Sequence, residues 1–121
     1  MKIISWIHRI FMVPIFCAIF MTAAMAYTNR ATAVIQIMNK AAGKTQTLNI
    51  PVGQSVKFEK LTLTVRACKQ SDPFDAENFY AFVEIELGGD NKIFGNWMDR
   101  NNPGRNPVQN PDYDAWLVRC E

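Results

Sequence analysis

The chain has 121 residues, of which 49% are hydrophobic and 20% charged, and its formal net charge is +2. This length suits one hydrophobic core rather than two. Lys2 and Arg9 lie in an N-terminal stretch that we expect to be removed, whereas all 11 acidic residues follow it. The expected mature chain is therefore neutral, which excludes the usual electrostatic argument for nucleic acid or an anionic membrane as a partner.

The first 26 residues have the layout of a secretory signal peptide. Lys2 and Arg9 give a positive start, residues 10–21 are an apolar run, and an Ala-Met-Ala cleavage site ends at Ala26. Pro14 interrupts the run, which is shorter than the ~20 residues of a membrane span. We expect cleavage after Ala26 and a periplasmic or secreted protein. The alternative is a membrane-tethered accessory subunit that keeps its leader.

Cleavage would remove 26 of the 121 residues and leave 95, forming one domain over residues 27–121. His8 and Cys17 would be lost, so Cys68 and Cys120 are the remaining cysteines. A disulfide is favoured over a metal site or a thiol nucleophile in an exported chain. Triads and zinc sites that need imidazole are excluded. We therefore expect a Cys68–Cys120 disulfide, no metal, no cofactor and no enzymatic activity.

The first half of this domain is predicted to hold three strands. After a frayed terminus at 27–31, residues 32–38 and 45–50 form a hairpin, which Pro51 ends. Residues 56–68 (VKFEKLTLTVRAC) then alternate apolar and polar side chains. Phe58 and Leu61 are an odd number of residues apart, so in a regular strand their side chains would point to opposite faces. We therefore expect a bulge near Glu59 that brings both to the same face.

The second half is predicted to hold three more strands. Residues 69–78 form a polar connection in which Ser71 caps one helical turn near Pro73. Residues 79–87 (FYAFVEIEL) are the clearest strand, and residues 92–98 (KIFGNWM) complete a hairpin with it. Residues 113–120 (YDAWLVRC) form the closing strand.

Residues 99–112 (DRNNPGRNPVQNPD) contain three prolines, one glycine and four asparagines, which predicts a long ordered loop. Such loops often carry function. Both cysteines end their strands, so these strands run parallel, lie in opposite sheets or meet through their end loops. About seven short strands predict an all-β fold, a small disulfide-linked β-sandwich or barrel.

Several of these segments resemble the domain of unknown function 2155, a family of small exported proteobacterial proteins. The resemblance lies in VGQSVKFEKLTLTVRAC, FYAFVEIE, IFGNWM and NPDYDAWLVRC. The positions that match the family pattern are Phe94, Trp97, Met98, Pro103, Pro111, Tyr113, Asp114, Trp116, Leu117 and Cys120. Asn96 replaces a usual glycine and Asn110 an expected histidine. The resemblance implies an envelope location and a shared fold, and it brings no known activity.

The candidate binding surface is the long loop and its flanks. Its aromatic and apolar side chains are predicted either to form a platform for a sugar, peptide or partner side chain or to belong to the core. Its arginines are predicted either to clamp a carboxylate or phosphate or to be solvated or paired with Asp99, Asp112 or Asp114. Asp114 is expected to cap loop amides. The residues are Trp97, Met98, Arg100, Arg105, Tyr113, Asp114 and Trp116.

Other acidic residues suggest weaker alternatives. Glu84 and Glu86 share a strand face at roughly 7 Å, which superficially fits a glycosidase but usually marks a hydrated face. Asp72, Asp75 and Glu77 are oxygen donors for a hard cation, yet they lack the pattern of an EF-hand loop. A solvated acidic turn is the simpler interpretation.

Taken together, these features predict a non-catalytic periplasmic or cell-envelope module. We expect it to bind or scaffold an envelope protein or glycan through the 99–112 loop. The alternative is a hydrolase or lyase that acts on an envelope glycan through Asp112, Asp114, Glu84 and Glu86. In that case one carboxyl group of a facing pair would have a raised pKa.

Overall fold

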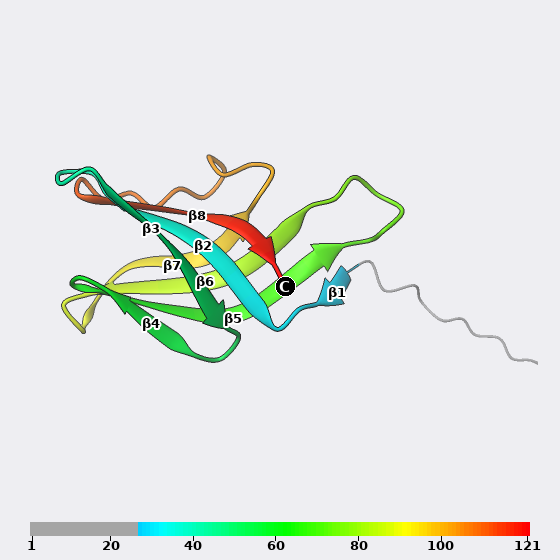
Figure 1. Cartoon of the computed structure of the whole chain (residues 1–121), viewed down its shortest axis with the longest axis horizontal. Coiled ribbons are helices and arrows are strands. Elements are labelled where there is room, and N and C mark those ends of the chain that lie inside the picture. Colours follow the sequence, from blue (N-terminus) through cyan, green and yellow to red (C-terminus); the bar gives the residue numbers. More distant parts are fainter. Residues whose placement is uncertain (1–26) are drawn as a thin grey trace, which may run out of the picture.

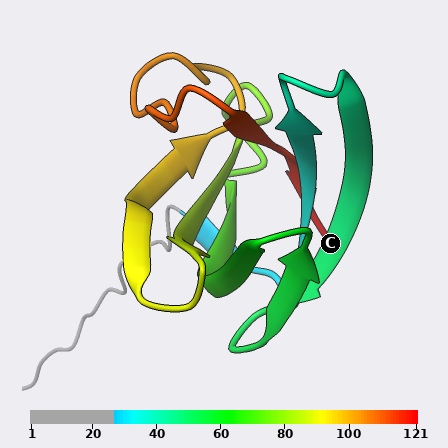
Figure 2. The same cartoon turned by 90° about the vertical axis from the view of Figure 1, so that its left-hand side faces the viewer.

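The computed structural model describes residues 27–121, which form two β-sheets packed face to face (Figures 1 and 2). The predicted all-β fold is confirmed, with eight strands where about seven were expected. The predicted leader lies outside the described residues. Among the described residues no helix is long and apolar enough to span a membrane. The strands are β1 (Tyr27–Asn29), β2 (Thr32–Asn39), β3 (Lys44–Pro51), β4 (Ser55–Phe58), β5 (Leu61–Ser71), β6 (Phe79–Leu87), β7 (Asn91–Asp99) and β8 (Tyr113–Cys120).

Strand β5 organises the five-stranded sheet. It pairs along its length with β6, which pairs in turn with β7, while β4 and β1 share its other side. Tyr27 of β1 lies opposite Ser71, the last residue of β5. The predicted frayed terminus at 27–31 is therefore wrong. Because β5 runs three residues past Cys68, its backbone supplies partners for residues 27–29.

The predicted bulge near Glu59 is also wrong. Phe58 lies opposite Leu61, so Glu59 and Lys60 form a two-residue hairpin turn between β4 and β5. Glu59 has a φ of 54°, the left-handed conformation that such turns require. Phe58 and Leu61 are an odd number of residues apart and still share one face, because the chain reverses direction between them. The bulge in β5 lies instead at Arg66, where the register with β6 shifts.

The second sheet has the order β3-β2-β8, and its β2–β3 hairpin is as predicted. Strand β8 is joined to the five-stranded sheet at both of its ends. Cys120 forms the predicted disulfide with Cys68, at a Cα–Cα distance of 5.8 Å. At the other end, the Tyr113 hydroxyl donates a hydrogen bond to Glu59 Oε1 at 3.2 Å. The two cysteines therefore lie in opposite sheets, one of the three arrangements expected.

The core lies between the sheets and follows the two-residue alternation of each strand. On β6 the predicted buried face is confirmed at Phe79, Ala81, Val83 and Ile85, while Leu87 is partly buried. The remaining apolar side chains of the core come mainly from β2, β3, β5 and β8. Across both sheets, the largest fully buried side chains are Ile35, Ile37, Ile50, Leu61, Leu63, Ile85, Val34, Val65, Val83 and Cys68.

The connection between β5 and β6 contains no helical turn, so that prediction is wrong. Ser71 belongs to β5, and its hydroxyl donates to the Ala76 carbonyl oxygen at 3.1 Å. The same hydroxyl oxygen accepts from the Asn78 backbone N–H at 2.9 Å. Asp72 Oδ1 accepts from the Phe74 N–H at 2.8 Å. These local bonds satisfy the backbone in a turn and compete with a helical cap.

Candidate binding surface

The predicted binding surface is divided between the core and two separate faces. Met98 and Tyr113 are only 5% and 7% exposed and belong to the core. Trp97 on β7 and Trp116 on β8 occupy positions that alternate with the buried positions of their strands, and both are partly exposed. The two tryptophans lie in different sheets. They therefore belong to different surfaces, and the single platform suggested by their flanking of one loop is not formed.

Trp97 lines a pocket on the outer face of the five-stranded sheet, here called the Trp97 pocket. It has a volume of about 200 Å³ and is lined by Tyr27, Lys69, Tyr80 and Trp97. Strand pairing brings these residues together, because Lys69 lies opposite Tyr80 and Phe82 opposite Trp97. The Tyr27 and Tyr80 rings meet edge to face, with centroids 5.4 Å apart. The Phe82 and Trp97 rings do likewise at 5.5 Å.

Lys69 carries the charge of this pocket. Its Nζ lies 5.3 Å from the centroid of the Trp97 ring and 5.9 Å from that of Tyr27. Cation–π contacts of this kind hold an ammonium between rings without neutralising it. The ion pairs among residues 27–121 do not include Lys69. The pocket thus presents a positive charge without a carboxylate partner.

A second pocket of about 280 Å³ adjoins the first, shares Tyr27 and Tyr80 with it, and is here called the acidic pocket. Asp72 and Asp75 supply its carboxylates. The side chain of Asp75 makes no hydrogen bond within the described part of the chain, whereas Asp72 uses one oxygen for Phe74. The two pockets, together called the groove, lie side by side and share Tyr27 and Tyr80; Lys69 lines one of them and Asp72 and Asp75 line the other.

Asn78 and Asp99 fix the loops around this groove. The Asn78 side-chain amide donates to Asp99 Oδ1 at 2.8 Å, and both side chains are buried. Asp99 also accepts from the backbone N–H groups of Asn101 and Asn102, at 3.0 and 3.2 Å. Burial by itself would raise the pKa of Asp99, but these hydrogen bonds outweigh it and lower the pKa. Asp99, and not Asp114, therefore caps the long loop.

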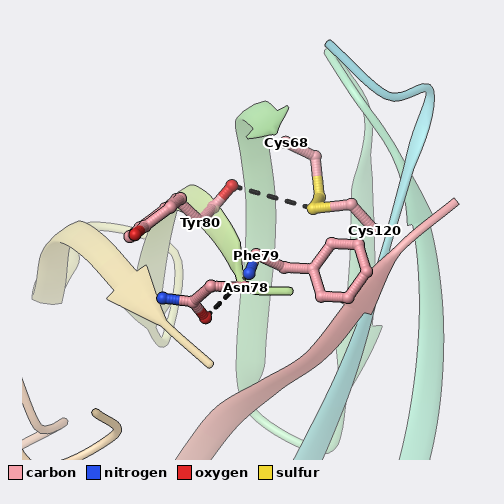
Figure 3. Close-up of a disulfide and its surroundings, with 5 residues drawn as sticks. All are labelled: Cys68, Asn78, Phe79, Tyr80 and Cys120. Atoms are coloured by element: carbon pink, nitrogen blue, oxygen red, sulfur yellow. Dashed lines mark hydrogen bonds between the residues drawn. A yellow bond between two sulfur atoms is a disulfide. The ribbon is translucent and has the colours of Figure 1, made fainter. Parts of the chain in front are cut away.

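The backbone of β6 connects the groove to the disulfide (Figure 3). Cys120 Sγ lies 3.7 Å from the Tyr80 carbonyl oxygen, a contact rather than a hydrogen bond because a disulfide sulfur carries no hydrogen. One residue earlier, the Phe79 N–H donates to Asn78 Oδ1 at 2.8 Å. The Tyr80 ring therefore projects from a strand end that is held on both sides.

The two arginines of the loop are engaged with acids and do not form a shared anion clamp. The Arg100 guanidinium pairs with the Glu77 carboxylate at 3.4 Å, donates to the Glu77 backbone carbonyl oxygen at 3.0 Å and lies over the Phe79 ring, 4.9 Å from its centroid. Arg105 lies 3.8 Å from Asp99 Oδ2. The pairing with Asp99 expected for these arginines is therefore found at Arg105.

Trp116 lines a separate groove of about 360 Å³ with Pro103, Gly104, Pro107 and Asp114, here called the Trp116 groove. Pro103, Gly104 and Pro107 form its other wall, and they belong to the long loop (orange in Figures 1 and 2). Asp114 Oδ1 accepts from the Ala115 backbone N–H at 2.9 Å. No cationic side chain lines this groove, which distinguishes it from the Trp97 pocket.

The acids considered for catalysis are not arranged as a facing pair. Glu84 is held by Arg66 at 2.8 Å and Lys92 at 3.2 Å. The hydrogen bond from Arg66, followed by that from Lys92, lowers the pKa of Glu84, the opposite of what a general acid needs. Among residues 27–121 no three His, Cys, Asp or Glu side chains gather as metal ligands.

Comparison with known families identifies one match. The family described as an uncharacterized protein conserved in bacteria (DUF2155) matches residues 33–120. The chain belongs to the DUF2155 family. Comparisons with curated proteins and with solved structures found no match.

The DUF2155 match includes three walls of the Trp97 pocket, namely Lys69, Tyr80 and Trp97. It begins after β1, so Tyr27 lies outside the matched segment. Three of the four walls are therefore part of the family domain, and the fourth is added by the segment that precedes it.

Sequence reasoning missed Tyr27, Lys69, Tyr80 and Phe82 as parts of one surface. The alternation of FYAFVEIEL placed Tyr80 and Phe82 on the face away from the core, which was a usable signal. Aromatic side chains on an outward face expose apolar surface, which marks a binding site more often than exposed glutamates do. The pairing of β1 with β5, which brings Tyr27 to this face, had no sequence signal.

Proposed function

We propose that this protein is a non-catalytic periplasmic or cell-envelope module that binds a ligand or partner at the Trp97 pocket. One observation carries the proposal: three aromatic rings and the Lys69 ammonium, which forms no ion pair within residues 27–121, line an open pocket on the outer face of a sheet. Convergent aromatic walls with a few polar groups are typical of binding sites.

The rigidity of the walls supports this assignment. Tyr80 and Trp97 project from paired strands, and the start of β6 is fixed by Asn78 and by contact with the disulfide. A site held in this way loses little conformational entropy on binding, so more of the contact energy appears as affinity. Tryptophan and tyrosine are also the residues that most often dominate binding energy.

Catalysis on an envelope glycan by carboxylates is the competing hypothesis. It requires two acids that flank one sugar. Glu84 lies on the five-stranded sheet and Asp114 on the three-stranded sheet. In both cases the side chain is directed away from the core. This separation, with the lowered pKa of Glu84, favours the binding hypothesis.

The proposed location is the periplasm or the cell exterior after cleavage at Ala26. The disulfide supports an oxidising compartment. Cleavage there would make Tyr27, a wall of the pocket, the first residue of the mature protein. The mass of the protein recovered from cells tests this: a chain beginning at Tyr27 supports cleavage, and the full-length mass supports a retained tether.

The binding function is tested by comparing Trp97→Ala and Tyr80→Ala with the matched control Trp116→Ala. Each variant would be expressed in cells, chemically crosslinked and purified with its crosslinked envelope components. We expect the first two variants to lose a component that the wild type and Trp116→Ala retain. Identical components for all four proteins would refute a binding role for the Trp97 pocket.

A further inference from the structure

We infer that the ligand of the Trp97 pocket is an acidic glycan in which acidic and neutral sugars alternate. This inference rests on the proposed binding function and adds the chemical class of the ligand. Three properties of the groove support it: the aromatic walls, the position of the cation and the position of the carboxylates.

The aromatic walls suit a sugar ring. The C–H groups on one face of a pyranose carry a partial positive charge and pack on the electron-rich face of an aromatic ring. Tyr27, Tyr80 and Trp97 offer such rings around about 200 Å³, and the acidic pocket adds about 280 Å³. Together these volumes lie in the range of small-molecule sites, a groove for a few sugar units rather than a protein domain.

The charges fix the order of the units. Lys69 lies between the Tyr27 and Trp97 rings and has no carboxylate partner within the described part of the chain. An acidic sugar stacked on Trp97 would place its carboxylate beside this ammonium and form a charge-assisted hydrogen bond.

The acidic pocket would reject a second acidic unit. Asp72 and Asp75 line the space beyond Tyr27 and Tyr80, and their two negative charges exceed the single positive charge that cleavage after Ala26 would give Tyr27, so another carboxylate would be repelled there. Hydroxyl and amide N–H groups of a neutral sugar would instead donate to these carboxylates. The groove therefore matches one acidic sugar followed by one neutral sugar.

The test is calorimetric titration of the protein in the form recovered from cells, with its disulfide intact, at low ionic strength. The probes are a hyaluronan tetrasaccharide, which alternates glucuronate and N-acetylglucosamine, and chitotetraose, which is uniformly neutral. We expect the wild type to bind the first probe more tightly than the second. Added salt should weaken the first interaction and leave the second unchanged.

Matched variants locate the interaction. Trp97→Ala should weaken binding of the acidic probe by at least about tenfold, and Trp97→Phe by less, because it keeps an aromatic wall. Lys69→Gln should remove the preference for the acidic probe. Trp116→Ala and Lys57→Gln, on other surfaces, should bind as the wild type does.

Two results would overturn the inference: no binding of the acidic probe, or equal binding of it by the wild type, Trp97→Ala and Lys69→Gln. If either occurs while Trp97→Ala still loses its crosslinked component in cells, the ligand class is wrong and the binding function stands. If the crosslinked component is also unchanged, both fail.

Discussion

The side-chain amide of Asn78 donates a hydrogen bond to Asp99 Oδ1 across 2.8 Å and so joins the loop before β6 to the loop after β7. Both residues are less than 10% exposed, at 7% and 8%. Asn78 Oδ1 also accepts from the N–H groups of Phe79 and Asn101, at 2.8 and 3.0 Å. One buried amide therefore satisfies groups from two loops and the first residue of a strand.

Replacing this amide should destabilise the fold. Asn78→Ala would remove the side-chain hydrogen bond to the buried Asp99 carboxylate and the side-chain acceptor of the Phe79 N–H, and we expect a loss of about 2–3 kcal/mol in the free energy of unfolding. Asn102→Ala is the matched control, since its amide is exposed and lies 3.4 Å from Asp99 Oδ2; a change within about 0.5 kcal/mol is expected. Urea unfolding measures both. Equal losses would contradict the role given to Asn78.

Asp99 should also make stability depend on pH in the acid range. Hydrogen bonds from Asn78, Asn102 and Asn101 lower its pKa despite burial. The contribution of the Asp99 carboxylate to the free energy of unfolding is therefore present above the ordinary carboxyl pKa of about 3.9. It is lost as the pH falls through the lower pKa of the folded state. Asp99→Asn should flatten this part of the stability curve. Glu84 should leave a residual slope, because its pKa is also lowered. A curve of unchanged slope would contradict the assignment.

The disulfide should contribute a large part of the stability. It joins residues 52 apart in sequence, and closing a loop of that length is worth about 4 kcal/mol in the chain-entropy model. The double variant Cys68→Ala, Cys120→Ala should lose about this amount in urea unfolding. A disulfide has no free thiol, so in the urea-unfolded protein a thiol reagent should label Cys68 and Cys120 only after reduction. Labelling of these two residues in the unfolded protein without reduction would show that the bond is absent.

Glu59 and Tyr113 make a second connection between the sheets that can be followed by titration. Burial, and then the nearby Glu59 carboxylate, raises the pKa of Tyr113. Glu59→Gln should lower this pKa while burial keeps it above about 10, the ordinary value. Because ionisation is disfavoured in the folded state, stability should fall as the pH rises above about 10. Absorbance titration measures the pKa, and Tyr113→Phe identifies its signal. An unchanged pKa would refute the coupling.

The strands after residue 79 were predictable because alternation and turn residues agree there. In FYAFVEIEL every second side chain from Phe79 to Ile85 is buried, so one periodic pattern determines which face meets the core. The disulfide was predictable because one cysteine of the three, Cys17, lies in the expected leader and the other two make a pair. Which sheet each cysteine occupies was left open, since strand polarity alone allows three arrangements.

The site was less predictable because tertiary pairing assembles it. Trp97 and Trp116 flank one loop in the sequence, yet strand order sends them to different sheets. Asp99 was considered only as an arginine partner, although its neighbours Asn101 and Asn102 suggested an acid that caps a turn. Tyr27 reaches the groove through the pairing of β1 with the last residues of β5, and no local pattern reports that pairing.

Site-specific photocrosslinking in living cells tests the binding function most directly. A benzoyl-phenylalanine placed at position 80 would sample the Trp97 pocket, and the same residue placed at position 116 would sample the Trp116 groove as a matched control. The account predicts a discrete adduct from position 80 that position 116 does not give, and that Lys69→Gln reduces. No adduct at position 80, or the same adduct from both positions, would contradict it.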